Sequence, residues 1–361
     1  MTNTHTWATG AREDESGGAR GGARGGESGE VSSVRLAVII PYYQKEVGFL
    51  RRALQSVASQ SVLNAGCELD VFIVDDHSPA CPATELETFD CPVGLRVRLL
   101  KTRRNGGPAA ARNLGLDSVA EDTDFVAFLD SDEVWTSNHL ENAVRALDGR
   151  LRDIYFSNYL RSDWKSDKFA ITGFGDGHEV LDGDRGLFLF TGCPLEDILI
   201  KATVRIQTCV VRWKSLRQLR FKESLLIGED AEYVASAILE HDSLLCFSRG
   251  IETIEEQVGI NVSQNRGGDA EKERQVRLRM LKYQVYLRRE MSLPKTLNAR
   301  VLEALQEARY NALRAALAPG SVGSRVGAFV RATTIDLGFP AYVLRKALDS
   351  LLNWQKKTLS L

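Results

Sequence analysis

Apolar and polar residues alternate in blocks along residues 34–135. Val34–Ile40 is a mostly apolar run, as is typical of a strand buried on both faces of a parallel sheet. Three further apolar runs follow and stop at polar clusters: Leu69–Val74, Leu95–Leu100 and Asp124–Leu129. Phe49–Gln60 and Ala109–Val119 between them repeat apolar residues at helical spacing. Strand alternating with helix predicts a doubly wound α/β sheet.

Polar clusters follow three of these predicted strands directly. They are Pro41-Tyr42-Tyr43, Asp75-Asp76-His77-Ser78 and Asp130-Ser131-Asp132. In sheets of this kind, ligands bind in the crevice beyond the carboxyl ends of the strands. The three clusters are therefore expected to converge on one site.

The acidic cluster Asp130-Ser131-Asp132 has the spacing of a metal site. Alternate residues leaving a strand can point the same way, which would bring the two aspartates to one divalent cation. Oxygen ligands suit Mg²⁺ or Mn²⁺, which usually completes its shell with phosphate oxygens from a substrate. An isolated D-x-D would be read as a solvated turn, and its place after an apolar strand favours the metal site.

Two other clusters allow more than one interpretation. Asp75-Asp76 either caps the next helix or binds a nucleoside, one carboxylate accepting a hydrogen bond from the base. The turn Asn105-Gly106-Gly107-Pro108 resembles a phosphate loop, but it lacks both G-x-x-x-x-G-K-S/T and G-x-G-x-x-G. A nucleoside triphosphatase or a nicotinamide enzyme is therefore disfavoured.

Four segments in order resemble the family 2 inverting glycosyltransferases. They are Val38-Ile39-Ile40-Pro41-Tyr42-Tyr43, Val74-Asp75-Asp76-His77-Ser78-Pro79, Asn105–Pro108 with Ala111-Arg112-Asn113, and Phe128-Leu129-Asp130-Ser131-Asp132-Glu133-Val134-Trp135. Gly228-Glu229-Asp230 looks like the acidic base motif of that family. The resemblance covers roughly residues 34–265 and is strongest to the succinoglycan-type exopolysaccharide glucosyltransferases.

The resemblance implies a GT-A fold and a set of site residues. It assigns Pro41, Tyr42, Asp75 or Asp76, Arg112 and Asp130 to the donor nucleotide, and Asp132 with Asp130 to the metal. Two departures stand out. His77 occupies a place where the family often has Gly or Asn, and Glu133 one where it often has a third Asp. The first affects a turn, and the second keeps a carboxylate.

Sugar transfer needs charge stabilisation on the leaving phosphates and a base for the attacking hydroxyl. A divalent cation serves the first need and a carboxylate the second. Asp230 is the candidate base, with Glu229 as the nearby alternative. Because both also precede a helical pattern, the simpler interpretation is an acidic first turn that favours the helix dipole. In-line attack would invert the donor and give a β-linked product from an α-linked donor.

The C-terminal segment differs in charge from the rest of the chain. Residues 271–361 hold 17 Lys+Arg against 7 Asp+Glu, a net +10, which leaves -12 for the remainder of a chain whose total is -2. Its amphipathic helices are predicted at Arg274–Arg289, Thr296–Ala318 and Val326–Trp354, the last interrupted at Gly338 and Pro340. They either lie on an anionic membrane or pack on the catalytic domain.

The remaining expectations concern organisation and location. Residues 1–33 are rich in Gly, Ser, Glu and Arg and predict a disordered leader. A nucleotide-binding half is predicted at 34–135, an acceptor-binding half at 136–265 and the helical tail at 266–361. With neither a signal sequence nor a long apolar run, the protein is expected in the cytoplasm, either free or peripheral on the inner face of the membrane. No nucleic-acid partner is expected.

The patterns together favour a metal-dependent inverting hexosyltransferase. We expect it to use a UDP-sugar, with UDP-glucose as the first candidate, and a lipid-linked oligosaccharide acceptor. A nucleotidyltransferase is the alternative enzyme, but Pro41–Glu46 lacks the Gly-rich basic signature expected near its first strand. A catalytically inactive binding protein with the same fold is the third possibility, and the intact acidic clusters argue against it.

Overall fold

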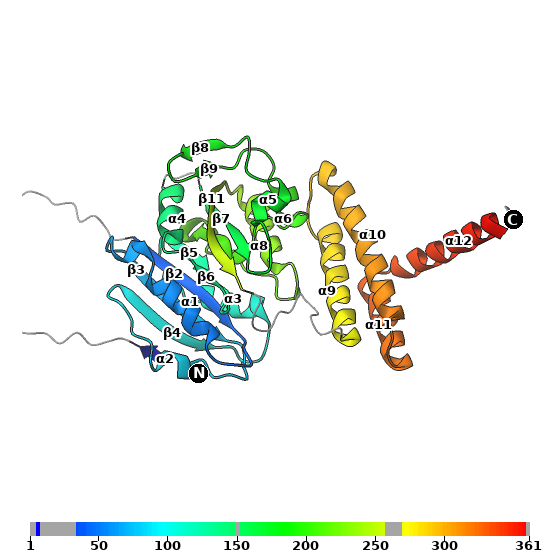
Figure 1. The fold of residues 1–361 in the computed structure, drawn as a ribbon, viewed down its shortest axis with the longest axis horizontal. Coiled ribbons are helices and arrows are strands. Elements are labelled where there is room, and N and C mark those ends of the chain that lie inside the picture. Colours follow the sequence, from blue (N-terminus) through cyan, green and yellow to red (C-terminus); the bar gives the residue numbers. More distant parts are fainter. Residues whose placement is uncertain (1–4, 8–33, 149–151, 257–268, 359–361) are drawn as a thin grey trace, which may run out of the picture. The chain divides into compact units, whose positions relative to one another are not determined.

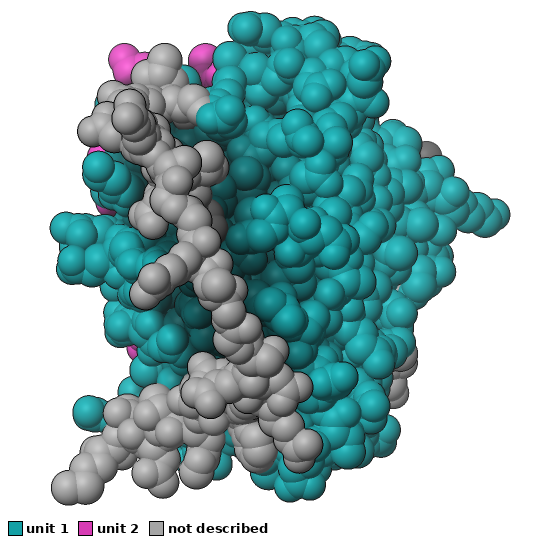
Figure 2. Space-filling view, turned by 90° about the vertical axis from the view of Figure 1, so that its left-hand side faces the viewer, with its two compact units in different colours: residues 1–191, 204–220, 241–259 teal, residues 192–203, 221–240, 260–361 magenta. Residues whose placement is uncertain are grey.

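The computed structural model describes residues 5–7, 34–148, 152–256 and 269–358. The chain divides into two compact units, coloured teal and magenta in Figure 2. The first contains residues 1–191, 204–220 and 241–259, and the second residues 192–203, 221–240 and 260–361. Each unit is described by itself. The predicted division into halves at 34–135 and 136–265 stays a prediction.

In the described part of the chain, the first unit contains one eleven-stranded sheet in the order β1-β4-β3-β2-β5-β10-β7-β11-β9-β8, with β6 paired to β11 (Figure 1). The strands are β1 His5–Trp7, β2 Arg35–Tyr42, β3 Glu68–Asp75, β4 Leu95–Lys101, β5 Phe125–Phe128, β6 Val134–Trp135, β7 Ile154–Arg161, β8 Glu179–Asp182, β9 Leu187–Leu189, β10 Cys209–Arg212 and β11 Leu245–Glu255. Strands β4, β3, β2 and β5 are parallel, and so are β7 and β11. Because β10 is antiparallel to both β5 and β7, all six of these strands point the same way.

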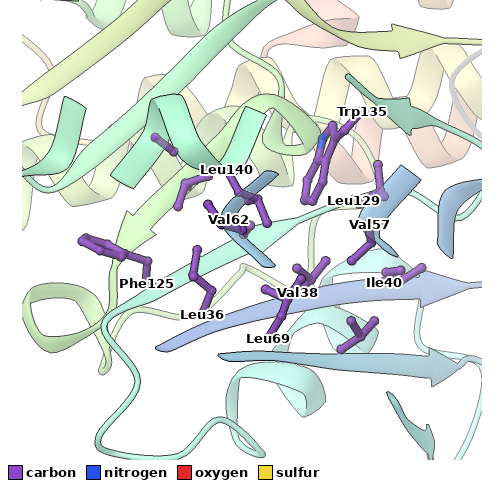
Figure 3. Packing of buried hydrophobic residues seen from close by; sticks show 14 of the residues in the cluster. Leu36, Val38, Ile40, Val57, Val62, Leu69, Phe125, Leu129, Trp135 and Leu140 are labelled. Carbon is purple, nitrogen blue, oxygen red and sulfur yellow. The ribbon is translucent and has the colours of Figure 1, made fainter. Parts of the chain in front are cut away.

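Alternation along β2 builds the two faces of the sheet. Leu36, Val38 and Ile40 point into one hydrophobic core together with Leu69 and Phe125 (Figure 3). This core also receives side chains of α1 Phe49–Ala58 and α4 His139–Leu147. Ile39 points to the other face, where α3 Pro108–Leu116 approaches so closely that a Cβ on Gly115 would lie 2.5 Å from Ile39 Cγ2.

The predicted α/β class is confirmed, and the four predicted strands and two predicted helices of residues 34–135 are present. Their ends agree with the prediction to within three residues, and β2, β3 and β4 each extend into the polar residues that follow the apolar run. Strand β1, which pairs antiparallel with β4, is a difference from the predicted disordered leader. The other residues of that leader lie outside the described part of the chain.

Short helices complete the first unit. They are the α-helices α2 Ala83–Leu86, α5 Lys168–Thr172 and α7 Trp213–Leu216 and the 3-10 helices η1 Ser61–Leu63 and η2 Ile206–Thr208. The second unit is helical. Its described helices are α6 Leu195–Leu199, α8 Glu229–His241, α9 Ala270–Arg289, α10 Lys295–Leu317, α11 Val322–Ile335 and α12 Phe339–Thr358.

The three predicted tail helices are present, and the third is two helices. The break falls at 336–338, where Asp336 accepts hydrogen bonds from Arg309 and from the Gly338 backbone. Pro340 lies in the first turn of α12, where the missing N–H has no helical partner to lose. Within the described residues, no helix combines the length and apolarity that crossing a membrane requires.

Candidate active site

The carboxyl ends of the parallel strands meet at one edge of the sheet. Tyr42 on β2 lies in register with Asp75 on β3, and Asp75 lies in register with Lys101 on β4. On the other side of β2, Ile39 pairs with Phe128, the last residue of β5. Asp130 follows two residues later, so the strand ends predicted to converge do so.

Asp75 is buried and held on two sides. Its Oδ1 accepts a 2.7 Å hydrogen bond from the Ser78 backbone N–H, and its Oδ2 lies 3.1 Å from Lys101 Nζ. The Ser78 hydroxyl in turn exchanges hydrogen bonds with the Gln44 backbone after β2. The carboxylate therefore joins the loops after β2, β3 and β4.

Asp76 faces a different partner, the Gly-rich turn. Its carboxylate accepts hydrogen bonds from the backbone N–H groups of Gly106 and Gly107, at 2.9 and 2.7 Å, and from the Thr102 hydroxyl at 2.8 Å. These donors occupy both oxygens. Asp76 thus holds the turn at the N-terminus of α3, whereas Asp75 is held by one backbone N–H and by the exposed Lys101.

The aromatic and imidazole side chains of these loops are fixed by the protein itself. Tyr42 is fully buried, and its hydroxyl donates to Glu85 at 3.2 Å. Burial and the Glu85 charge raise the pKa of this phenol. At Tyr42 only the backbone can therefore serve the predicted nucleoside contact, whereas Pro41 is partly exposed. His77 adopts φ +60, a left-handed conformation that Gly and Asn accept most readily.

Arg112 lies on α3 and points at the acidic cluster. Its Nη2 donates a 2.7 Å hydrogen bond to Asp130 Oδ1. The arginine side chain is buried, whereas the Asp130 side chain is about one-third exposed. One oxygen of Asp130 is thus oriented by a buried cation.

The backbone after β5 turns at the acidic cluster, since Glu133 N donates to Asp130 O at 3.1 Å. The two aspartates are therefore brought together by a turn and not by strand alternation. Burial and the Asp130 charge raise the pKa of Asp132 to about 7. Burial and the neighbouring carboxylates raise the pKa of Glu133 far above its usual range.

This cluster suits a divalent cation in chemistry, although not as a complete cage. Carboxylates crowded in a buried position repel one another, and a cation would relieve that repulsion. Across the ranges that the structure describes, no three His, Cys, Asp or Glu side chains are grouped so as to hold a metal ion. A cation at Asp130 and Asp132 would therefore need further ligands from a substrate, as phosphate oxygens provide.

Several residues at this edge were not predicted from the sequence. Gln207, on η2, donates from Nε2 to Glu133 Oε1 at 3.0 Å, and Gln44 donates from Nε2 to Ser131 Oγ at 3.1 Å. Glu255 is the last residue of β11. Burial raises its pKa, and the Asp130 charge raises it further. Apolar periodicity carries no signal for such contacts, because each partner comes from a distant segment.

Glu229 and Asp230 lie in the second unit, in the first turn of α8. Glu229 is buried, and Asp230 is partly exposed and accepts a 2.8 Å hydrogen bond from the Ala231 backbone N–H. Gly228 before them has φ +82 and packs under the ring of Tyr283. Burial raises the pKa of Tyr283, and the charges of Asp230, Glu232 and Glu229 raise it further. The catalytic roles of Glu229 and Asp230 stay predictions.

Sequence comparisons found a matching family and a similar protein. The sequence profile of Glycosyl transferase family 2 matches residues 37–192. Succinoglycan biosynthesis protein ExoW of Rhizobium meliloti (strain 1021) is 34% identical over 220 residues, covering 60% of this chain and 67% of ExoW.

Two solved structures resemble the fold. S. aureus TarS 1-349 in complex with UDP-GlcNAc superposes with a TM-score of 0.50 at 18% identity, covering 85% of this chain and 92% of that chain. Mannosyltransferase PcManGT from Pyrobaculum calidifontis, in complex with GDP-Man and Mn²⁺, superposes with a TM-score of 0.50 at 16% identity, covering 90% and 88%.

The mixed sheet and these fold neighbours define a GT-A-like α/β domain with C-terminal helices. The chain belongs to glycosyl transferase family 2. The predicted family, fold class and enzyme class are confirmed.

Proposed function

We propose that this enzyme is a metal-dependent inverting hexosyltransferase that uses a UDP-sugar, with UDP-glucose as the first candidate. The observation that carries the proposal is the meeting of Asp75, Asp130 and Asp132 at the carboxyl edge of the parallel strands, with Arg112 against Asp130. One fold neighbour is a complex with UDP-GlcNAc, and another is a complex with GDP-Man and Mn²⁺. These complexes support a nucleotide sugar as donor and a divalent cation, Mg²⁺ or Mn²⁺, as cofactor.

The donor nucleotide is proposed to lie across the loops after β2, β3 and β5. The Asp75 carboxylate offers an acceptor for a base N–H, and the backbone at Pro41 and Tyr42 borders the same place in the sheet register. Asp76 acts through the turn that it holds, which keeps the N-terminus of α3 and its Arg112 in place. Arg112 orients Asp130 for the ribose or the metal.

Sugar transfer needs stabilisation of the negative charge on the leaving diphosphate and removal of a proton from the acceptor hydroxyl. A cation bound by Asp130 and Asp132 would stabilise the negative charge that develops on the leaving diphosphate, an effect worth several kcal/mol. Asp230 is proposed to accept the proton of the acceptor hydroxyl as its oxygen bonds to the anomeric carbon and the bond to the diphosphate breaks. General base catalysis of this kind contributes about 10²–10⁴ in rate, and attack opposite the leaving group inverts the anomeric centre.

The acceptor is proposed to be a lipid-linked oligosaccharide in exopolysaccharide assembly. The similarity to ExoW, a succinoglycan biosynthesis protein, supports this class of pathway. We propose that the enzyme works at the inner face of the cytoplasmic membrane, where such a lipid carrier would be found.

A thermal-shift panel of nucleotide sugars with and without Mn²⁺ tests the donor site. We expect stabilisation by a UDP-sugar that depends on the metal and is lost in D132A, because that variant removes a metal ligand. The proposal fails if no nucleotide sugar stabilises the wild type, or if D132A keeps the metal-dependent shift.

The base assignment needs a separate measurement. D230N should bind donor as the wild type does and transfer no sugar, since the amide cannot accept the proton. E229Q is the matched control on the neighbouring residue, and it should retain transfer. Undiminished transfer by D230N would exclude Asp230.

A further inference from the structure

Helix α11 presents its large apolar side chains to solvent. Val322, Val326 and Val330 are 75%, 56% and 56% exposed, and Phe329 between them is 37% exposed. Their spacing of four, seven and eight residues from Val322 places all four on one side of the helix. We call this set the outer face of α11.

The opposite side of α11 is made of small residues. Ala328 and Ala332 are buried, and Ser324 and Gly327 are partly buried beside them. This side packs against α9, whose residues Leu278 and Leu281 belong to the core that contains Ala332. A surface helix ordinarily buries its large apolar residues and exposes polar ones. In α11 the valines lie on the exposed side and small residues on the buried side, while Ile335 in the last turn packs against the core.

Further exposed leucines follow α11 along the chain. Leu337, in the break between the helices, is 75% exposed, and Leu344 and Leu348 on α12 are 66% and 59% exposed. The two α12 leucines are four residues apart and therefore share a side of that helix. Figure 1 shows α12, in red, extending away from α9 and α10. Exposed apolar groups gathered on one side of a helix mark interaction surfaces.

The charges around these apolar residues are mainly positive. Arg325, Arg345 and Lys346 are exposed. Arg331 lies 3.5 Å from Glu271, and the acidic Asp336 is buried against Arg309. Asp349 is the other acidic residue of 321–350. The exposed apolar surface is therefore bordered by a net positive charge.

We propose that the outer face of α11, together with Leu337, Leu344 and Leu348, docks on the surface of an anionic lipid bilayer. Apolar side chains on one side of a helix enter the boundary between headgroups and acyl chains, while the basic residues attract anionic headgroups. The inference goes beyond the proposed reaction, because it rests on the tail and on no residue of the donor site.

The same charges disfavour a second copy of the chain as the occupant. A two-fold dimer through this surface would bring its own Arg325, Arg345 and Lys346 close to their symmetry mates. Like charges facing each other across an interface oppose association. An anionic membrane matches both the apolar residues and the charge.

Vesicle flotation with the full chain tests the proposal. Wild-type protein should float with vesicles of phosphatidylcholine and phosphatidylglycerol in equal parts, and remain unbound with phosphatidylcholine alone. V326E/V330E should lose about a hundredfold or more in affinity, because it removes two apolar contacts and adds negative charge. R345Q/K346Q should lose roughly thirtyfold at about 1 kcal/mol per basic residue, and added salt should weaken wild-type binding.

V93E/V180E is the matched control. It makes the same substitution at two exposed valines of the first unit and should float like the wild type. Equal flotation by V326E/V330E and the wild type would overturn the proposal. So would sedimentation showing a wild-type dimer that V326E/V330E converts to monomers without any vesicle binding. Thermal shift with nucleotide sugars, run on the same samples, reports separately on the donor site.

Discussion

Arg112 Nη2 donates a 2.7 Å hydrogen bond to Asp130 Oδ1, which ties helix α3 to the turn after β5. The arginine is buried, so its charge is shielded from water and its direction is fixed. The pairing leaves the second carboxylate oxygen of Asp130 for a ligand. Helix α3 has no acidic residue of its own, and through Arg112 it orients Asp130.

R112M should destabilise the protein by about 1–3 kcal/mol, because it leaves a partly buried carboxylate without its partner. It should also weaken nucleotide-sugar binding at least tenfold, or about 1.4 kcal/mol. Urea unfolding and a donor titration measure the two effects. R220M breaks the partly exposed pair of Arg220 with Asp117, the residue that follows α3, and should cost less than about 1 kcal/mol. Equal effects of both variants would contradict the special position of Arg112.

G228A should impair the proposed base by displacing the first turn of α8. Gly228 has φ +82, and a Cβ on it would lie 2.4 Å from the Tyr283 ring. The left-handed backbone costs an alanine about 1 kcal/mol, and the steric clash adds roughly 1–3 kcal/mol. Chemical denaturation should therefore show a loss of about 2–4 kcal/mol, with a matching loss of transfer activity.

G173A separates the two causes in G228A. Gly173 has φ +64 and nothing within 4 Å of an added Cβ, so only the backbone cost of about 1 kcal/mol remains. The double variant G228A/Y283A removes the steric clash. The G228A substitution should therefore cost less stability in the Y283A background than in the wild type. If G228A proves as mild as G173A, the close packing of Tyr283 is not what fixes this turn.

Lys168 should make part of the folding stability depend on pH. Burial and the nearby Arg205 charge lower the pKa of Lys168 to about 8, from 10.5 in the unfolded chain. Below pH 8 both states carry the proton, and folding bears the cost of a buried charge. As pH rises from 8 toward 10.5, the folded state has lost its proton while the unfolded state keeps it. Stability attributable to Lys168 should therefore rise with pH.

K168M is the comparison that isolates this contribution, because its side chain cannot be charged. The free energy of unfolding of the wild type, relative to K168M, should increase between pH 7.5 and 10, measured by urea titration at about six pH values. K165M removes an exposed lysine from the same segment and is the matched control. A wild-type advantage that falls over this range would have the wrong sign and would contradict the assignment.

His77 should tolerate glycine better than alanine. Its φ is +60, and its ring Nε2 lies 2.9 Å from the Thr102 carbonyl oxygen. H77A loses that contact and keeps the backbone strain, whereas H77G loses the contact and relieves the strain. H77A should therefore be less stable than H77G by about 1 kcal/mol in thermal unfolding. A202G, at another residue with positive φ, should stabilise the protein because it relieves the same backbone strain. Donor binding by H77G should be unchanged.

The apolar runs of residues 34–135 predicted the strands of the sheet, because a strand buried on both faces needs apolar residues at successive positions. Leu36–Ile40 is such a run and is buried throughout, and Leu69–Val74 is buried except at Asp70. The polar residues that stop them, Asp75 and the cluster at Asp130, were therefore placed at the carboxyl edge by local pattern alone.

The roles of adjacent acidic residues could not be separated in this way. Asp75 and Asp76 look equivalent in the sequence, yet Asp76 is occupied by the backbone N–H groups of Gly106 and Gly107, thirty residues away. Glu133 likewise has its partner in Gln207. Contacts of this range follow from the packing of whole strands and helices, which no local window records.

The sequence by itself determined the α/β alternation, the family and the positions of the acidic clusters, because burial and chemistry impose composition on short segments. Only the tertiary structure decided that Arg112 orients Asp130, that Tyr283 packs on Gly228, and that α11 turns its small side to the core. Periodicity states which residues share a side of a helix or strand. Which side is covered, and by what, depends on the neighbours that folding brings to it.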